Sequence, residues 1–255
     1  MPISLARQEE FAVLTIDRPE AHNALSFLLI RELDECLDEV FKSDARALLI
    51  RGTGTKAFSA GADVAELAGL PATAHRANIE FGQRVFSRIE TLPMISIALI
   101  NGYAFGGGLE LALSCTFRLA STTAKMGLPE VKLGLIPGYG GTQRLPRVIG
   151  ETRALELILS GKIMGAQEAF QAGLVSSLVE GDLVEAGISY ARQFTQHSLE
   201  TLRLARSAVC RALVSPLNEG LKVEADLSTV ACRTADAAEG IQAFLQKRPP
   251  SFQDS

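Results

Sequence analysis

Residues that bind metals or form disulfide frameworks are scarce in this chain. Its 255 residues include three histidines and four cysteines. The cysteines form no C-x-x-C pair, and neither residue type recurs at the short intervals that a metal site needs. We therefore expect reduced thiols and no bound metal. The four cysteines are Cys36, Cys115, Cys210 and Cys232.

Long apolar runs and an excess of basic residues are also lacking. No run of about 18 apolar residues occurs, which excludes a membrane-spanning helix. The N-terminal segment has no apolar stretch of signal-peptide length. The formal net charge is -4, and lysine and arginine are scattered along the chain, which argues against a nucleic acid or an anionic membrane as partner. We expect a cytoplasmic protein that binds small molecules or other proteins.

The composition favours a compact globular protein. Hydrophobic residues make up 47% of the chain and charged residues 21%. The first half repeats a pattern of a short apolar run, a loop and a helical stretch. We expect strands at 11–16, 47–50 and 95–100, and helices at 26–41, 74–89 and 109–114. Strands that alternate with helices predict an α/β fold with mostly parallel pairing, because parallel strands need long crossovers.

From residue 150 onward the chain is predominantly helical. Helical periodicity covers 151–160, 182–195, 199–213, 217–232 and 236–246, with one short apolar run at 174–179. No linker rich in glycine, serine or proline separates this part. We expect a core at 1–190 and a helical region at 191–255 that belong to the same domain.

Three glycine-rich segments follow apolar runs, at 57–63, 101–110 and 136–144. Such turns gather at the carboxyl ends of parallel strands, where ligands bind, although each segment alone fits ordinary turn chemistry. The segment 106–111 lacks the final small residue of a dinucleotide motif, and the segment 52–56 lacks the spacing of a P-loop. The first segment nearly matches a serine-hydrolase elbow around Ser59, but it lacks the first glycine. The histidines that could serve it, His75 and His197, lie in helical patterns.

Together, these motifs identify the chain as similar to the enoyl-CoA hydratase (crotonase) family. The ordered set runs from Asp17-Arg18-Pro19 to the C-terminal segment 239–249. Between them lie Ala60-Gly61-Ala62-Asp63, the segment 101–110, Pro129-Glu130 and the segment 137–145. The resemblance implies a spiral of ββα units followed by helices that build a homotrimer or a hexamer, as a dimer of trimers. It also implies an acyl-CoA thioester substrate and no separate cofactor, because coenzyme A is part of that substrate.

The resemblance assigns four catalytic positions. The backbone amides of Ala62 and Gly107 would form an oxyanion hole, and Gly107 opens an expected helix, where free N–H groups favour negative charge. Glu110 would activate water and Glu130 would supply the α-proton. Each glutamate alone fits an exposed acid at a helix start or a turn. Their joint placement in matching motifs favours the catalytic interpretation.

The resemblance also implies a coenzyme A site and an acyl pocket. Asp63 equally fits a helix cap, and Lys247 an ordinary helix end. Two departures from the family pattern, Glu20 and Ala65, reduce the positive charge expected near the coenzyme A phosphates. Tyr139 is bulkier than the alanine common in the family and is expected to trim the acyl pocket. The coenzyme A residues are His22, Ala60, Asp63, Val64, Phe244 and Lys247, the last two from a neighbouring subunit; the pocket residues are Leu67, Phe81, Gly138 and Tyr139.

These residues predict a 2-trans-enoyl-CoA hydratase that forms a 3-hydroxyacyl-CoA. Two alternatives stay open at this point. One is a related acyl-CoA isomerase, decarboxylase or thioester hydrolase, and the other is a non-catalytic protein that binds coenzyme A.

Overall fold

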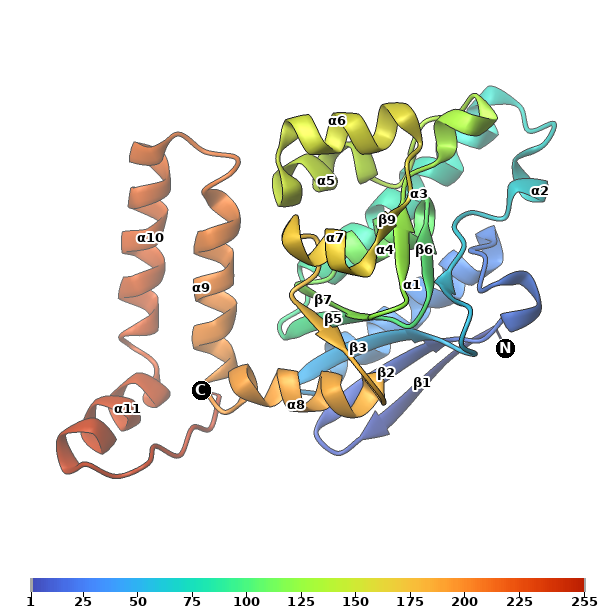
Figure 1. Ribbon diagram of the computed structural model, residues 1–255. Helices are drawn as coiled ribbons and strands as arrows, with labels where there is room; N and C mark the ends of the chain where they lie inside the picture. Colours follow the sequence, from blue (N-terminus) through green and yellow to red (C-terminus); the bar gives the residue numbers. More distant parts are fainter. Residues whose placement is uncertain (1, 255) are drawn as a thin grey trace. The chain divides into compact units, whose positions relative to one another are not determined.

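A computed structural model describes residues 2–254 of the chain (Figure 1). The chain divides into two compact units, one ending at Ser189 and the other beginning at Tyr190. Among the described residues, no helix is long and apolar enough to cross a membrane. The assignment of residues 1–190 and 191–255 to a single domain stays a prediction.

A six-stranded mixed sheet forms one layer of the first unit. Its strands β2, β3, β5, β7 and β10 pair in parallel, while β1 pairs with β2 as an antiparallel hairpin. Every residue of β5 is buried, as its unbroken apolar run predicts. In sheet order the strands are β1 (Ile3–Gln8), β2 (Phe11–Ile16), β3 (Ala47–Gly52), β5 (Ile95–Ile100), β7 (Phe117–Ser121) and β10 (Ser177–Val179).

A second mixed sheet consists of shorter strands. It contains, in order, β4 (Ala57–Ser59), β6 (Tyr103–Phe105), β8 (Lys125–Gly127) and β9 (Met164–Gly165). The first three are parallel, and β9 runs antiparallel to β8. The pairs β3/β4, β5/β6 and β7/β8 each give one strand to each sheet, and each pair precedes a helix. This repeat is a spiral of ββα units, so the expected α/β fold is confirmed.

The helices of the first unit bury apolar stripes against these sheets. Helix α1 (Phe27–Lys42) begins at Ser26, whose hydroxyl accepts a hydrogen bond from the Leu29 amide at 3.1 Å, as the sequence predicts. All eight residues of α4 (Gly107–Ser114) are buried. The other helices are η1 (Pro19–Ala21), α2 (Val64–Leu67), α3 (Ala72–Glu90), η2 (Glu130–Leu133), α5 (Gly141–Ile149), α6 (Glu151–Ser160) and α7 (Ala166–Gln171).

The second unit is helical, as expected. Helix α8 (Leu183–Thr195) runs across the division, and α9 (Leu199–Arg211), α10 (Leu217–Ala231) and α11 (Ala235–Gln246) follow. The Thr234 hydroxyl caps α11 by accepting a hydrogen bond from the Ala237 amide at 3.1 Å. Several large apolar side chains of these helices are exposed, including Leu217 and Phe244.

Candidate active site

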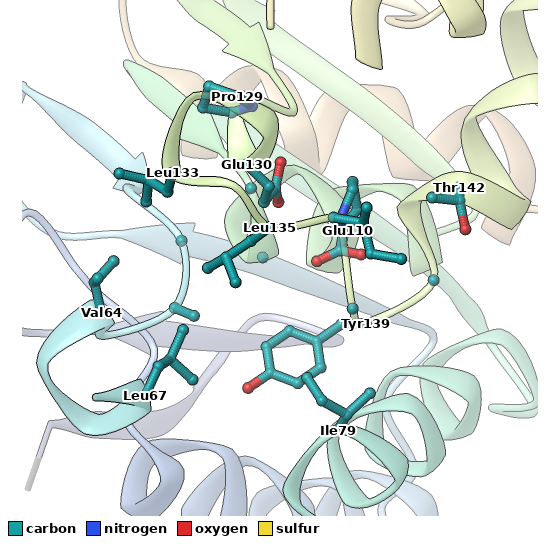
Figure 2. Close-up of a pocket in the computed structure, with 18 of the residues that line it drawn as sticks. Val64, Leu67, Ile79, Glu110, Pro129, Glu130, Leu133, Leu135, Tyr139 and Thr142 are labelled. Atoms are coloured by element: carbon teal, nitrogen blue, oxygen red, sulfur yellow. The ribbon is translucent and has the colours of Figure 1, made fainter. Parts of the chain in front are cut away.

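The first unit contains a cleft of about 930 Å³. Its walls come from the loop after β4, one face of α3, the start of α4 and the segment between β8 and α5 (Figure 2). These are the three glycine-rich segments of the sequence together with a helix that faces them. The spiral therefore brings parts of the chain that are distant in sequence to one cavity.

Two backbone amides lie side by side in the cleft wall. Gly107 is the first residue of α4, a position whose N–H has no partner inside the helix. Within residues 2–254, neither its amide nor that of Ala62 donates a hydrogen bond. A Cβ atom built on Gly107 would lie 3.3 Å from the Ala62 nitrogen, so the two amides are close neighbours. This pair can stabilise a negative oxygen, and the positive end of α4 adds to the effect.

Glu110 projects from the first turn of α4 and is only 1% exposed. Its Oε1 accepts a hydrogen bond from the Gly141 amide at 2.7 Å. Burial raises the pKa of Glu110 to about 7, assisted by the charge of Glu130 and opposed by the Gly141 and Tyr139 amides and by Arg144. A carboxyl group with a pKa near neutral can both take up and release a proton at working pH.

Glu130 begins η2, directly after Pro129, and also lines the cleft. Burial raises the pKa of its carboxyl group, and its own backbone amide lowers it in part. Its Oε2 is buried and has no hydrogen-bond partner among the described residues. Figure 2 shows the Glu110 and Glu130 carboxylates in the same part of the cleft. An unpartnered buried oxygen of this kind fits a site that a substrate or a water completes.

Glycines surround the two carboxylates because side chains would displace them. A Cβ on Gly106 would lie 2.8 Å from Glu130 Oε1, and one on Gly141 would lie 3.0 Å from Glu110 Cγ. Gly106 also has a φ of +49°, which side-chain-bearing residues rarely adopt. The glycine-rich motifs therefore make room for the acids as well as forming turns.

Tyr139 closes one end of the cleft with a side chain that is 2% exposed. Its ring packs edge-on against Phe86 at 5.4 Å between centroids. A Cβ on Gly82 would lie 2.4 Å from the ring, so helix α3 admits Tyr139 only because position 82 is glycine. Figure 2 shows the ring reaching toward the side chains of Leu67 and Ile79.

Most of the predicted site residues meet in this one cleft. Of the residues predicted for the acyl pocket, Phe81 does not line this cleft. Cleft-lining residues of α3, such as Ile79 and Gln83, are four apart, and Phe81 lies between them on another face of the helix. It borders a separate hollow, with the Arg84 guanidinium 5.4 Å from its ring. The predicted residues that line the cleft are Ala60, Ala62, Val64, Leu67, Gly107, Glu110, Glu130, Gly138 and Tyr139.

Within the first unit, two residues predicted near coenzyme A lie outside the cleft lining. The exposed His22 contributes its backbone, since its carbonyl accepts a hydrogen bond from the Ala60 amide at 3.0 Å. Asp63 precedes α2 but makes no side-chain cap, because its carboxylate pairs with Arg18 at 3.4 Å. Phe244 and Lys247 belong to the second unit, where Phe244 is 83% exposed and Lys247 follows α11. Their contact with coenzyme A stays a prediction.

The serine-hydrolase alternative does not fit the structure. Ser59 is fully buried in β4, and its hydroxyl accepts a hydrogen bond from the Gly61 amide at 3.2 Å. A serine nucleophile must present its hydroxyl to the substrate with a histidine beside it. His75 lines the cleft, but Ser59 does not.

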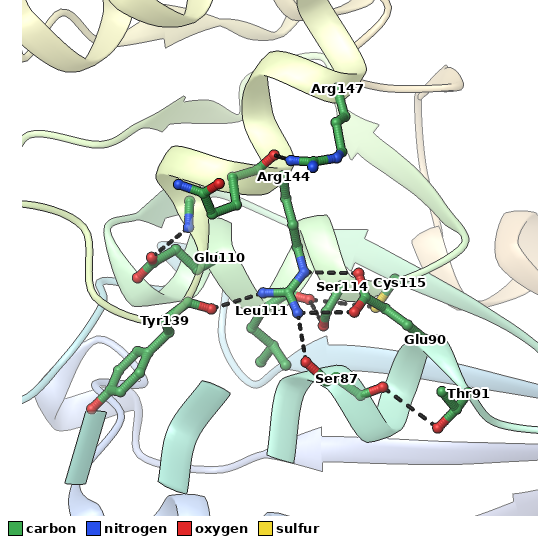
Figure 3. A network of polar contacts seen from close by, with 12 residues as sticks. Ser87, Glu90, Thr91, Glu110, Leu111, Ser114, Cys115, Tyr139, Arg144 and Arg147 are labelled. Atoms are coloured by element: carbon green, nitrogen blue, oxygen red, sulfur yellow. Dashed lines mark hydrogen bonds and ion pairs between the residues drawn. The ribbon is translucent and has the colours of Figure 1, made fainter. Parts of the chain in front are cut away.

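Sequence reasoning did not predict the residues that hold the turn beside Glu110. Arg144 on α5 donates to the Tyr139 carbonyl and to Glu90 of α3 (Figure 3). Gln83 of α3 donates to the Gly138 carbonyl at 2.7 Å. Arg144 belongs to the third glycine-rich segment, so its position was visible. Its partners on α3 are more than 50 residues away in sequence, and no sequence signal joins them.

The chain is similar to known proteins over nearly its whole length. The family model described as "Enoyl-CoA hydratase/isomerase" matches residues 6–255. The chain is 45% identical over 255 residues to a probable enoyl-CoA hydratase of Bacillus subtilis, with 98% of each chain covered. It is 39% identical to the crotonyl-CoA hydratase of Syntrophomonas wolfei, covering 98% of this chain and 97% of that one. The chain therefore belongs to the enoyl-CoA hydratase/isomerase (crotonase) family.

A solved structure extends the agreement to the fold. The enoyl-CoA hydratase from Bacillus anthracis aligns with a TM-score of 0.95 at 38% identity, covering 100% of both chains. The α/β spiral with its C-terminal helices is thus the crotonase fold.

Proposed function

We propose that this protein is an enoyl-CoA hydratase, which adds water across the double bond of a 2-trans-enoyl-CoA to give a 3-hydroxyacyl-CoA. The observation that carries the proposal is that the buried Glu110 and the half-buried Glu130 meet in one cleft beside two free amides. Relatives at 45% and 39% identity bear the names probable enoyl-CoA hydratase and crotonyl-CoA hydratase, which supports it.

The proposed reaction uses each of these groups once. The thioester oxygen accepts hydrogen bonds from the Ala62 and Gly107 amides, which withdraws electrons from the double bond. The oxygen of a water held by Glu110 attacks Cβ as Glu110 takes its proton, and negative charge moves to the thioester oxygen. The two amides stabilise this enolate, typically contributing about a hundredfold or more in rate per donor. The enolate then collapses as Glu130 gives a proton to Cα.

The raised pKa values of both acids suit this division of work. Glu130 must carry a proton when the enolate collapses, and burial favours its protonated form. Glu110 must be ionised to activate water, and the Gly141 amide and Arg144 favour that form against burial. Burial and the charge of Glu130 both disfavour ionisation of Glu110.

The substrate end of the proposal extends to coenzyme A and the acyl chain. The coenzyme A portion is assigned to His22, Ala60, Asp63 and Val64, together with Phe244 and Lys247 of a neighbouring subunit. The acyl chain is assigned to the part of the cleft that Leu67, Gly138 and Tyr139 border. Because the buried Tyr139 ring closes that end, short acyl chains are the expected substrates.

The direct test follows the conjugated absorbance of crotonyl-CoA and of longer enoyl-CoAs. The wild-type protein should remove this absorbance, while Glu110→Gln and Glu130→Gln should each lose about a hundred- to ten-thousandfold in kcat, as expected for a general acid or base. No loss of absorbance at any chain length would refute hydration. Isomerase, decarboxylase or thioesterase activity that survives Glu110→Ala would instead assign another reaction of the family.

A further inference from the structure

The turn at residues 138–141 carries the amide that holds Glu110, and side chains fix this turn from its other side. The Gly138 carbonyl accepts a hydrogen bond from Gln83 Nε2 at 2.7 Å, and the Tyr139 carbonyl accepts one from Arg144 Nη1 at 2.8 Å. The Gly141 amide donates to Glu110 Oε1 at 2.7 Å. Two carbonyls are thus anchored while an amide of the same turn meets the carboxylate.

Arg144 is itself held in one orientation by helix α3. Its Nε and Nη2 donate to the two Glu90 oxygens at 2.8 and 2.9 Å, and Nη2 also donates to Ser87 Oγ at 3.1 Å (Figure 3). The Arg144 side chain is 14% exposed. The planar guanidinium suits this arrangement because it can bind a carboxylate with two parallel bonds and still donate elsewhere.

Gly140 lets the guanidinium approach the turn closely. A Cβ at this position would lie 2.2 Å from Arg144 Nη1, and the backbone φ of +111° strains any other residue. The hydrogen bond from the Arg144 amide to the Gly140 carbonyl at 2.8 Å closes the same turn. Arg144 therefore forms hydrogen bonds with the turn through both its backbone and its side chain.

We propose that Arg144 is a positioning residue, which holds the 138–141 turn so that the Gly141 amide keeps the Glu110 carboxylate in place for water activation. The inference rests on the proposed function, because it concerns the carboxylate assigned to the water. Arg144 does not line the cleft and so does not touch the substrate there. It acts on the reaction through the turn and through its charge.

The charge of Arg144 has a predictable effect on titration. It lowers the pKa of Glu110, whereas burial and the charge of Glu130 raise it. The Tyr139 phenol interacts electrostatically with Glu110, but burial raises the pKa of Tyr139 to about 12, so it stays neutral in the assay range. The acid limb of the kcat/KM profile should therefore respond to Arg144 in a direction that a purely structural residue would not produce.

The test compares three arginine variants on crotonyl-CoA. Arg144→Gln removes both the positive charge and the fork, which is the pair of parallel N–H donors of the guanidinium. Its kcat should fall about tenfold to a hundredfold with KM unchanged. The acid limb of its kcat/KM profile should move to higher pH. Arg144→Lys keeps the charge but loses the fork, so kcat should fall and the acid limb should move less than in Arg144→Gln. The control, Arg147→Gln, removes an exposed arginine of the same helix whose side chain donates to the Gln143 carbonyl, and both parameters should stay at wild-type values.

Each outcome decides the inference. A wild-type kcat and acid limb in Arg144→Gln, as expected for Arg147→Gln, would overturn the inference. If Arg144→Gln does not fold, a wild-type kcat in Arg144→Lys would overturn it. If the wild-type protein shows no hydration, the proposed function fails, but the inference is still tested by carboxyl infrared or NMR titration. A Glu110 pKa that is higher in Arg144→Gln than in wild type supports the inference there, and an unchanged pKa overturns it.

Discussion

The burial of Glu110, the proposed base, affects the stability of the fold as well as the proposed chemistry. An isolated glutamate ionises at a pKa of about 4.3 in the unfolded chain, whereas burial raises the pKa of Glu110 to about 7 in the folded protein. Because its folded pKa is raised, the native state binds more protons than the unfolded chain between these values, and stability falls as pH rises through that window. The position of Glu110 therefore destabilises the fold at the pH where it can act as a base.

This conflict predicts that Glu110→Gln gains stability relative to wild type as the pH is raised. The amide keeps an oxygen to accept the Gly141 hydrogen bond but cannot ionise. Its advantage in the free energy of unfolding should grow by about 2 kcal/mol between pH 5 and pH 8, since each unit of pKa difference corresponds to about 1.4 kcal/mol. Urea denaturation at both values measures it.

The control for this prediction is Glu80→Gln on helix α3, where an exposed acid pairs with Arg76. Its free energy of unfolding relative to wild type should stay nearly constant from pH 5 to pH 8, because surface pairs contribute little. A pH-independent difference for Glu110→Gln as well would show that Glu110 is not strongly perturbed by burial.

At the start of helix α4, both the backbone conformation and a close contact restrict which residue can occupy position 106. Gly106 has a φ of +49° and borders Glu130 Oε1, while the next residue offers its amide to the cleft. We predict that Gly106→Ala lowers kcat on crotonyl-CoA about a hundredfold, because a displacement of about 1 Å at a reacting group has effects of this size. Steady-state kinetics measures the loss.

Gly150→Ala separates this effect from backbone strain alone. Gly150 has a φ of +83°, but a Cβ there would meet no atom within 4 Å. The control should lose stability, by about 1–3 kcal/mol for a strained backbone, and keep its kcat. Equal kcat losses in the two variants would mean that strain, and not contact with Glu130, limits position 106.

The elements that the sequence predicts well are those with a long, uninterrupted signal. The apolar run of β5 and the capped stripe of α1 determined their type and nearly their bounds. Strands β4, β6 and β8 were not predicted, because three residues are too few to show alternation, and parallel neighbours hold them. Phe81 lies outside the cleft lining, and periodicity alone could not indicate this because it does not say which helix face meets a cleft.

At the scale of the whole molecule, motif order predicted the groups of the proposed reaction but not the residues that support them. Ala62, Gly107, Glu110 and Glu130 each lie in a segment whose residue types are unusual enough to recognise. The ion pair between Arg144 and Glu90 depends on α3 packing beside α5, which is a tertiary contact between ordinary charged residues. Such contacts leave no mark in a single sequence.

Assembly is the property of the whole molecule that remains as a proposal, and exposed apolar residues of the second unit support it. On helix α10, Leu217 is 78% exposed and Leu221 is 54% exposed, one helical turn apart. Such faces usually mark an interface. We predict that sedimentation gives three or six times the chain mass of 27.3 kDa.

A double substitution, Leu217→Glu with Leu221→Glu, should lower this sedimenting mass, because it places charge on the apolar face. The matched control is Lys222→Glu on the same helix, whose side chain contacts Glu219, and it should leave the mass unchanged. A wild-type protein that sediments as a single chain at micromolar concentration would contradict the proposed assembly.

The spiral has a consequence for how this site can be inherited. Its turns follow one another along the chain. The segments that line the cleft therefore occur in sequence order, as the loop after β4, the start of α4, η2 and the start of α5. Residues 62 to 144 thus carry both amides, both acids and the arginine behind them as one continuous stretch. Within a family that shares this fold, recombination of that single stretch would transfer all the groups of the proposed reaction together. The sheet edges and the C-terminal helices would then come from the other parent sequence.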